Sequence, residues 1–271
     1  MTLERGPDGP AYPPALYAAT HGGVDGDVDF YLRACAGAAS VLELGSGTGR
    51  VAHALARAGF DVTGLERDRA FIEHAPRAWP ASAARFVEGD MCDFALGTRF
   101  DRVIIPFNGV YCLPDDDAVE RCLRCASAHL HRGGLLVFDA YAADAFHADA
   151  DRTALAAEEE EPVCAVTVDG VGYDVRERTV WAPDEQCIDA FYRYVARPAA
   201  RRPAPMSAEY RIRHHYLLSQ QVAPMLERAG LDLLVLHGGF DESAFDEGSE
   251  LLVVTATRQV DDGQSWHEVR G

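Results

Sequence analysis

The sequence contains no lysine, so all 25 of its basic side chains are arginines. This absence excludes enzymes that use a lysine Schiff base or a pyridoxal-phosphate anchor, and it excludes the phosphate-binding lysine of a Walker loop. Basic residues are also scarce beside 43 acidic ones, which leaves a formal charge of −18. Because nucleic acids and anionic membranes attract basic surfaces, we expect neither as a partner.

Long apolar runs are missing as well. The N-terminal stretch MTLERGPDGPAYPP has no apolar core of signal-peptide length, and no segment approaches the ~20 apolar residues of a membrane span. A cytoplasmic protein is therefore expected. The seven cysteines are odd in number and irregularly spaced in a chain of 271 residues, which predicts free thiols.

No metal site is expected either. Cys122 and Cys125 form a C-x-x-C pair, but the pair lies in a helical pattern without a second pair at zinc-finger spacing. The run Asp115 to Asp117 begins a helix, where negative charge favours the positive end of the helix dipole, so it is interpreted as a cap.

From residue 38 onward, strands and helices alternate. The hydrophobic pattern predicts strands at 40–45, 61–66, 84–90, 100–108 and 135–141, with helices at 48–60, from Asp68 onward and at 115–134. Such alternation requires crossover connections. It predicts an α/β fold with a doubly wound, Rossmann-like, mostly parallel seven-stranded sheet.

After residue 144 the pattern changes to period two. Residues 173–195 predict an antiparallel hairpin around Ala-Pro-Asp-Glu, and residues 209–217 predict a further strand. The alternation of helices and strands then returns, with a helix at 219–230 and strands at 231–238 and 250–258. The acidic run 158–161 is interpreted as solvated, and 196–205 as a proline-rich connector. The predicted organisation is an irregular N-terminal arm and a helix at 1–37, a core at 38–144 and 217–258, an antiparallel insertion at 145–216 and a flexible tail at 259–271.

The first strand-to-helix turn, VLELGSGTGR at 41–50, is the main binding motif. Glycines let a backbone approach a ligand closely, and the first turn of a doubly wound sheet lies where ligands bind. A dinucleotide turn would require Gly-x-Gly-x-x-Gly or Ala, but its last position here is Arg50. Glu43, two residues before the first glycine, would repel a diphosphate and suits a ligand that carries an ammonium group.

In this motif and in three others, the sequence resembles the class I S-adenosylmethionine-dependent methyltransferases. Glu66 ends the second strand, EGDMCDF follows the third, and FDRVIIPFNGVYCLPDDD and HLHRGGLLVFDAY match the fourth strand and the turn into the fifth. The resemblance implies S-adenosyl-L-methionine as cofactor and S-adenosyl-L-homocysteine as product. In the family, Glu66 would bind the ribose hydroxyls and Asp90 would lie near the adenine amino group. The implied cofactor-binding residues are Glu43, Gly45, Ser46, Gly47, Gly49, Glu66, Arg67, Asp90, Met91, Pro106 and Phe107.

A finer similarity is to bacterial small-molecule methyltransferases of secondary metabolism, including sugar N-methyltransferases and glycine-type N-methyltransferases. They share a tyrosine-bearing N-terminal arm, like AYPPALYAAT here, and an antiparallel insertion that covers the acceptor. This similarity implies an enzyme that transfers a methyl group to nitrogen or oxygen, with carbon left open, of a small-molecule acceptor. A homodimer is expected as the commonest assembly of such a chain.

The catalytic candidates are His214, Tyr17 and Asn108. Histidine titrates near neutrality, so His214 is favoured as general base, with a surface histidine pair at 214–215 as the alternative. Tyr17 lies on the arm, and Asn108 follows the fourth strand. The substrate-binding candidates are Tyr111, Tyr141, His21, Arg176, Tyr192, Arg213 and Tyr216, although strand alternation sends about half of those on the insertion to solvent.

Two other functions stay open. The same fold and cofactor could serve transfer or cyclisation of the aminocarboxypropyl group, or the chain could be a non-catalytic cofactor-binding module. The presence of Glu43, Glu66 and Asp90 argues against lost cofactor binding.

Overall fold

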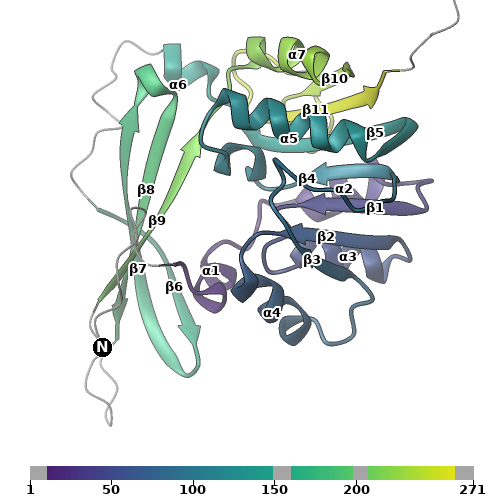
Figure 1. The fold of residues 1–271 in the computed structure, drawn as a ribbon. Coiled ribbons are helices and arrows are strands. Elements are labelled where there is room, and N and C mark those ends of the chain that lie inside the picture. The colour runs from purple at the N-terminus through teal and green to yellow at the C-terminus, as the bar shows by residue number, and fades with distance from the viewer. Residues whose placement is uncertain (1–10, 149–159, 198–206, 260–271) are drawn as a thin grey trace, which may run out of the picture.

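The computed structural model describes residues 11–148, 160–197 and 207–259 (Figure 1). The first ten residues of the predicted arm, Glu158 and Glu159 of the acidic run, 198–205 of the connector and 260–271 of the tail lie outside the described residues.

A seven-stranded sheet forms the centre of the molecule, in the order β10-β11-β5-β4-β1-β2-β3. The strands β1 to β5 pair in parallel and β11 pairs antiparallel with both neighbours, so the predicted mostly parallel α/β sheet is confirmed. The strands are β1 (Ser40–Leu44), β2 (Asp61–Glu66), β3 (Arg85–Glu88), β4 (Phe100–Ile105), β5 (Leu130–Tyr141), β10 (Leu231–His237) and β11 (Leu251–Arg258).

Helices cover both faces of this sheet. Along β1, Leu42 and Leu44 belong to a core cluster with α5 (Asp116–Ala128) and α7 (Ser219–Arg228). Val41, on the opposite side, packs with α2 (Asp27–Ala34) and α3 (Arg50–Arg57). The alternation of β1 side chains therefore builds two apolar layers, as a buried parallel strand requires.

Aspartates begin two of the helices, as predicted. Asp68 caps α4 (Arg69–Ala78) by accepting the backbone N–H of Ala70 at 2.8 Å. Asp115 caps α5 by accepting that of Ala118 at 2.8 Å, so the acidic run at 115–117 is a helix start.

One predicted boundary is wrong. The helix expected over 115–134 ends at Ala128, and β5 begins at Leu130. The Gly-Gly pair lies inside the strand, where Gly133 has φ +72° and the pairing with β4 shifts register. A Cβ on Gly134 would lie only 3.0 Å from the His131 carbonyl and 3.1 Å from that of Asp101. The glycines therefore form a β-bulge instead of a helix stop.

The insertion after β5 is an antiparallel four-stranded sheet in the order β6-β7-β8-β9, which confirms the predicted hairpin and the strand after it. Its strands are β6 (Glu161–Val168), β7 (Val171–Ala182), β8 (Cys187–Ala196) and β9 (Ala208–His215), with the short helix η2 (Pro183–Glu185) between β7 and β8. It stands beside the core, and α6 (Asp144–Ala148) precedes it (Figure 1).

The N-terminal arm is partly helical. Residues Pro14–Thr20 form α1, which packs between β6 and α4 (Figure 1), whereas the sequence predicted irregular structure. Pro14 at the first helical position is compatible with a helix because its missing N–H would be unpaired there. The arm thereby connects the insertion to the core.

All seven cysteines are free thiols. Across 11–148, 160–197 and 207–259, no helix combines the length and apolarity needed to cross a bilayer.

Candidate functional site

A cavity of about 420 Å³ opens at the carboxyl ends of β1, β2, β3 and β4. The turn after β1 forms its floor, and α1, β9 and the short helix η1 (Gly109–Cys112) form its other walls. The sequence-predicted residues that line it are Tyr17, His21, Glu43, Gly45, Ser46, Gly47, Glu66, Arg67, Asp90, Met91, Pro106 and Phe107. Segments far apart in the chain thus meet at the place where doubly wound sheets bind ligands.

The glycines of the first turn have left-handed backbones, with φ +67° at Gly45, +53° at Gly47 and +79° at Gly49. Gly49 lies outside the cavity lining. A Cβ there would meet the Phe86 ring at 2.7 Å, so Gly49 permits close packing at the start of α3. Gly45 and Gly47 are the glycines of the turn that face the ligand space.

Glu66 closes the turn from the end of β2. Its Oε2 accepts the backbone N–H of Gly47 at 2.8 Å, and its Oε1 accepts that of Asp68 at 2.9 Å. Each carboxylate oxygen has a second lone pair, so the side chain can hold the turn and still accept two hydrogen bonds from a ligand.

Glu43 is a buried carboxylate on the cavity wall, with 3% of its surface exposed. Its Oε2 has no hydrogen-bond partner among the described residues. Burial raises the pKa of Glu43 to about 8, although the nearby Arg50 guanidinium acts in the opposite direction. Buried polar atoms are rarely left without partners. An ammonium group in the cavity would supply the missing donor and the compensating charge.

Arg50 and Asp27 form an ion pair that the sequence did not predict. The two terminal nitrogens of Arg50 donate to the two oxygens of Asp27 at 2.8 and 2.5 Å, and Arg50 also lines the cavity. Gly23 lies against this guanidinium, where a Cβ would be 2.4 Å from Cζ. From the sequence alone, Asp27 is recognisable as a residue that begins a helix, and nothing indicates that it pairs with Arg50.

Asp139 shapes the loop after β4. Its Oδ1 accepts the Tyr31 hydroxyl at 2.5 Å and the Phe107 N–H at 2.9 Å, while burial raises its pKa to about 6. Phe107 and Asn108 adopt positive φ of 54° and 58°. The Asn108 Oδ1 accepts the Tyr141 N–H at 2.8 Å, so this predicted catalytic residue bridges β4 and β5 outside the cavity lining.

Two predicted substrate contacts are core residues, because their side chains are completely buried. Tyr111 donates its hydroxyl to the carbonyls of Tyr141 and Leu217 at 3.0 and 3.1 Å. Tyr216 is hydrogen-bonded to Trp181 Nε1 at 3.0 Å and to His147 Nδ1 at 2.8 Å. Both tyrosines belong to one buried cluster that contains residues of the core and Trp181 of the insertion, and neither lines the cavity.

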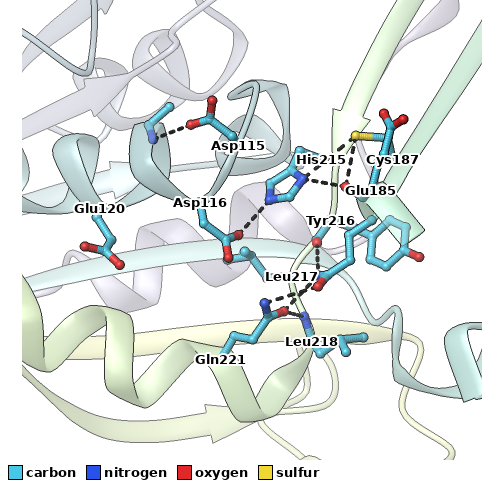
Figure 2. Close-up of polar contacts among 12 residues, drawn as sticks. Asp115, Asp116, Glu120, Glu185, Cys187, His215, Tyr216, Leu217, Leu218 and Gln221 are labelled. Carbon is cyan, nitrogen blue, oxygen red and sulfur yellow. Dashed lines mark hydrogen bonds and ion pairs between the residues drawn. The ribbon is translucent and has the colours of Figure 1, made fainter. Parts of the chain in front are cut away.

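The histidines at 214 and 215 do not form a surface pair. His215 is buried, and its Nε2 lies 2.7 Å from Asp116 Oδ1 on α5 while its Nδ1 lies 3.2 Å from the Glu185 carbonyl (Figure 2). His214 is half-buried beside the rings of Tyr141 and Tyr111, with centroids 5.7 and 6.3 Å away. Burial lowers the pKa of His214 to about 4. Its imidazole is therefore neutral and weakly basic, and it borders the cavity-lining residues without being one of them.

Tyr141 and Tyr192 are two further predicted substrate contacts. The Tyr141 hydroxyl is buried and has no hydrogen-bond partner in the described parts of the chain. The Tyr192 ring meets His21 edge-on, with centroids 4.7 Å apart. Neither residue lines the cavity.

Among the insertion arginines, Arg211 reaches the cavity, whereas Arg176 and Arg213 do not. Arg213 pairs with Glu185 at 3.0 Å, and Arg176 pairs with Glu160 at 3.4 Å. The prediction assumed that one face of the strand would point inward. β9 is an edge strand packed against η1 (Figure 1). Arg211 and Arg213 lie on the same face of this strand, so their position along it, and not the face, distinguishes them.

The remaining cavity-lining residues were not predicted. They are Thr48, Arg50, Val51, Leu65, Asp68, Phe71, Gly89, Gly109, Cys112, Leu113 and Arg211. Most adjoin a predicted residue in sequence, so extending each motif by two or three positions would have included them.

Residues 41–134 match the family model described as a methyltransferase domain. A curated relative, the dTDP-3-amino-3,4,6-trideoxy-alpha-D-glucopyranose N,N-dimethyltransferase of Streptomyces venezuelae, is 29% identical over 102 residues. This match spans 38% of the present chain and 42% of the relative.

Solved structures extend the similarity over nearly the whole chain. The CcbJ methyltransferase from Streptomyces caelestis has a TM-score of 0.70 and 25% identity, covering 87% of this chain and 90% of that one. The sugar N-methyltransferase KedS8 from Streptoalloteichus has a TM-score of 0.74 and 20% identity. The match covers 96% of this chain and 98% of KedS8, and it shows that the two proteins share a fold.

Proposed function

The chain contains a methyltransferase domain within the fold of the S-adenosylmethionine-dependent methyltransferases, and on this premise we propose that it transfers a methyl group from S-adenosylmethionine to a nitrogen of a small-molecule metabolite. The observation that carries the proposal is the buried Glu43 carboxylate on the wall of the cavity, whose Oε2 has no hydrogen-bond partner among the described residues. The curated relative, an amino-sugar N,N-dimethyltransferase, favours nitrogen over oxygen as the acceptor atom.

The residues present fit this cofactor. Glu43 binds the ammonium of the methionyl end, and Glu66 accepts the ribose hydroxyls while it holds the turn. Asp90 and Met91 receive the adenine on the side of β3. The several carboxylates on this wall also favour a ligand that carries a sulfonium and an ammonium.

When bound, the cofactor supplies a methyl group already activated on sulfur, so the protein mainly aligns the acceptor and excludes water. Tyr17 and His21 of the arm and Arg211 of β9 line the side of the cavity away from the glycine turn. The acceptor binds there, under the insertion. The division into an arm and helix at 1–37, a two-part core at 38–144 and 217–258, and a covering insertion at 145–216 belongs to this proposal.

With a formal charge of −18, the protein acts on a small molecule in the cytoplasm and binds neither nucleic acid nor membrane, and a homodimer is its proposed assembly.

The test has two parts. Calorimetric titration with S-adenosylmethionine measures binding, and incubation with a panel of small primary and secondary amines, followed by mass spectrometry, measures turnover. S-adenosylhomocysteine and a methylated amine are the expected products. Methylthioadenosine would indicate aminocarboxypropyl chemistry instead, binding without any product from the panel would favour a binding module, and no binding would overturn the proposal.

A further inference from the structure

A chain of hydroxyl groups holds the imidazole of His21. The Nε2 of His21 lies 3.0 Å from the Tyr12 hydroxyl, which lies 2.6 Å from the Tyr194 hydroxyl. The Tyr194 hydroxyl contacts Thr20 Oγ1 and donates to the Leu16 carbonyl at 3.3 Å. The chain thus runs from the cavity wall to the backbone of α1, and Tyr194 belongs to β8 of the insertion.

Every contact in this series of hydroxyl groups is a hydrogen bond only when Thr20 and Tyr12 both donate to Tyr194 and Tyr194 donates to the Leu16 carbonyl. A carbonyl oxygen only accepts, and a hydroxyl has one proton. When Tyr194 gives its proton to the Leu16 oxygen, Tyr194 must accept from Tyr12. Tyr12 then has no proton left for His21, so it must accept from an Nε2–H. The neutral imidazole is therefore protonated at Nε2, and Nδ1 has the lone pair.

The surroundings of His21 keep this imidazole neutral before an acceptor binds. Its ring lies against Tyr17 and Tyr192, with centroids 4.6 and 4.7 Å away, and it lines the cavity. Burial lowers the pKa of His21 to about 4, and the neighbouring His214 acts in the same direction. No group of the described chain hydrogen-bonds Nδ1. This nitrogen is thus available to a ligand in the cavity.

We propose that His21 is a catalytic residue whose Nδ1 accepts the N–H of the acceptor amine, and that Tyr12 and Tyr194 are positioning residues that fix its tautomer. This inference rests on the proposed methyl transfer to nitrogen. It assigns the base role to His21, which lines the cavity, and not to His214, which does not, and it makes the arm and the insertion jointly responsible for one functional atom.

The acceptor nitrogen uses its lone pair for the new N–C bond, while the electron pair of the broken S–C bond stays on sulfur. The proton lost by the nitrogen passes to Nδ1, and solvent takes it from there when the product leaves. Throughout, Nε2–H stays bonded to Tyr12, so no hydroxyl must reorient. Primary and secondary amines have the required N–H, and tertiary amines do not.

The test compares Tyr12→Phe with a matched control, Tyr210→Phe. The Tyr210 ring stacks on Tyr12 with centroids 4.8 Å apart, but the Tyr210 hydroxyl is not one of the hydroxyl groups that connect His21 to the Leu16 carbonyl. Nitrogen NMR of histidine-labelled full-length protein, with His21 assigned from His21→Gln, reports the tautomer at pH 7. We expect a protonated Nε2 and an unprotonated Nδ1 in the parent protein and in Tyr210→Phe, and mixed tautomers in Tyr12→Phe. A protonated Nδ1 in the parent protein would overturn the assignment.

Kinetics test the catalytic part with the amine of the panel that the parent protein methylates fastest. We expect kcat to fall about 100-fold in His21→Gln and about 10-fold in Tyr12→Phe, and to stay within about twofold in Tyr210→Phe. Calorimetry should show an S-adenosylmethionine Kd within about twofold of the parent value in all three. Equal kcat values for Tyr12→Phe and Tyr210→Phe would overturn the positioning role. If S-adenosylmethionine binds but no amine is methylated, the proposed function fails, whereas the tautomer is still measured by NMR.

Discussion

Arg50 and Asp27 face each other as a two-pronged ion pair, with N–O distances of 2.8 and 2.5 Å. The pair joins the first residue of α2 to the first residue of α3, directly beside the glycine turn. The helix α2 is thereby attached to the end of the cavity that the glycine turn forms. The guanidinium is partly exposed, whereas the carboxylate is almost fully buried.

Replacing Asp27 by asparagine should destabilise the fold by about 2 kcal/mol, because it leaves the partly buried Arg50 charge without compensation. Urea unfolding gives the free energy directly. Asp29→Asn is the matched control, since Asp29 lies in the same helical turn but is exposed. Equal stability of the two variants would contradict the assigned importance of the pair.

Replacing Glu66 by alanine should weaken S-adenosylmethionine binding about 10- to 100-fold, because the ribose would lose its acceptor and the turn would lose the bond to Gly47. Glu88→Ala serves as control. Glu88 pairs with Glu66 in the sheet register at the end of β3, is exposed, and is not a cavity-lining residue. Titration calorimetry measures both Kd values, and an unchanged Kd for Glu66→Ala would exclude its role.

Cofactor binding should release a proton from Glu43. Burial raises the pKa of Glu43 to about 8 in the free protein, and a bound ammonium would lower it. The carboxyl is therefore mostly protonated below pH 8 and must lose its proton on binding, so affinity should rise with pH between about 6 and 7.5. Calorimetry in two buffers of different ionisation enthalpy counts the proton. Glu43→Gln should release none, and equal proton counts in the two proteins would refute the linkage.

His215 should anchor the end of β9 to α5 through Asp116, at a distance of 2.7 Å (Figure 2). Because Asp116 is about half exposed, we expect Asp116→Asn to cost only about 1 kcal/mol of unfolding free energy. Asp117 is the next residue of the same helical turn and is exposed. Asp117→Asn should therefore lower the unfolding free energy by less than half as much as Asp116→Asn. Thermal or urea unfolding measures the stability of both variants. A larger loss of stability in Asp117→Asn than in Asp116→Asn would contradict the anchoring role of His215.

Local sequence patterns predicted much of the fold. The period of the apolar residues located β1, β2 and β4 because a strand buried on both faces is a short continuous apolar run. Gly45 and Gly47 marked the turn because their positive φ is unfavourable for other residues. The Gly133–Gly134 pair was misassigned because glycine ends helices and forms bulges alike, and only the pairing of β5 with β4 distinguishes the two.

By itself, the sequence determined the α/β class, the position of the glycine turn and the acidic residues at the strand ends, since each depends on contacts within a few residues. The tertiary structure alone decided which distant side chains share the site. Tyr12 and Tyr194 meet across 182 positions, and Arg50 meets Asp27 across 23. Arg211 lines the cavity, whereas Arg213, two residues further along the same face of β9, pairs with Glu185. Such relationships depend on how the arm and the insertion pack, which no local pattern encodes.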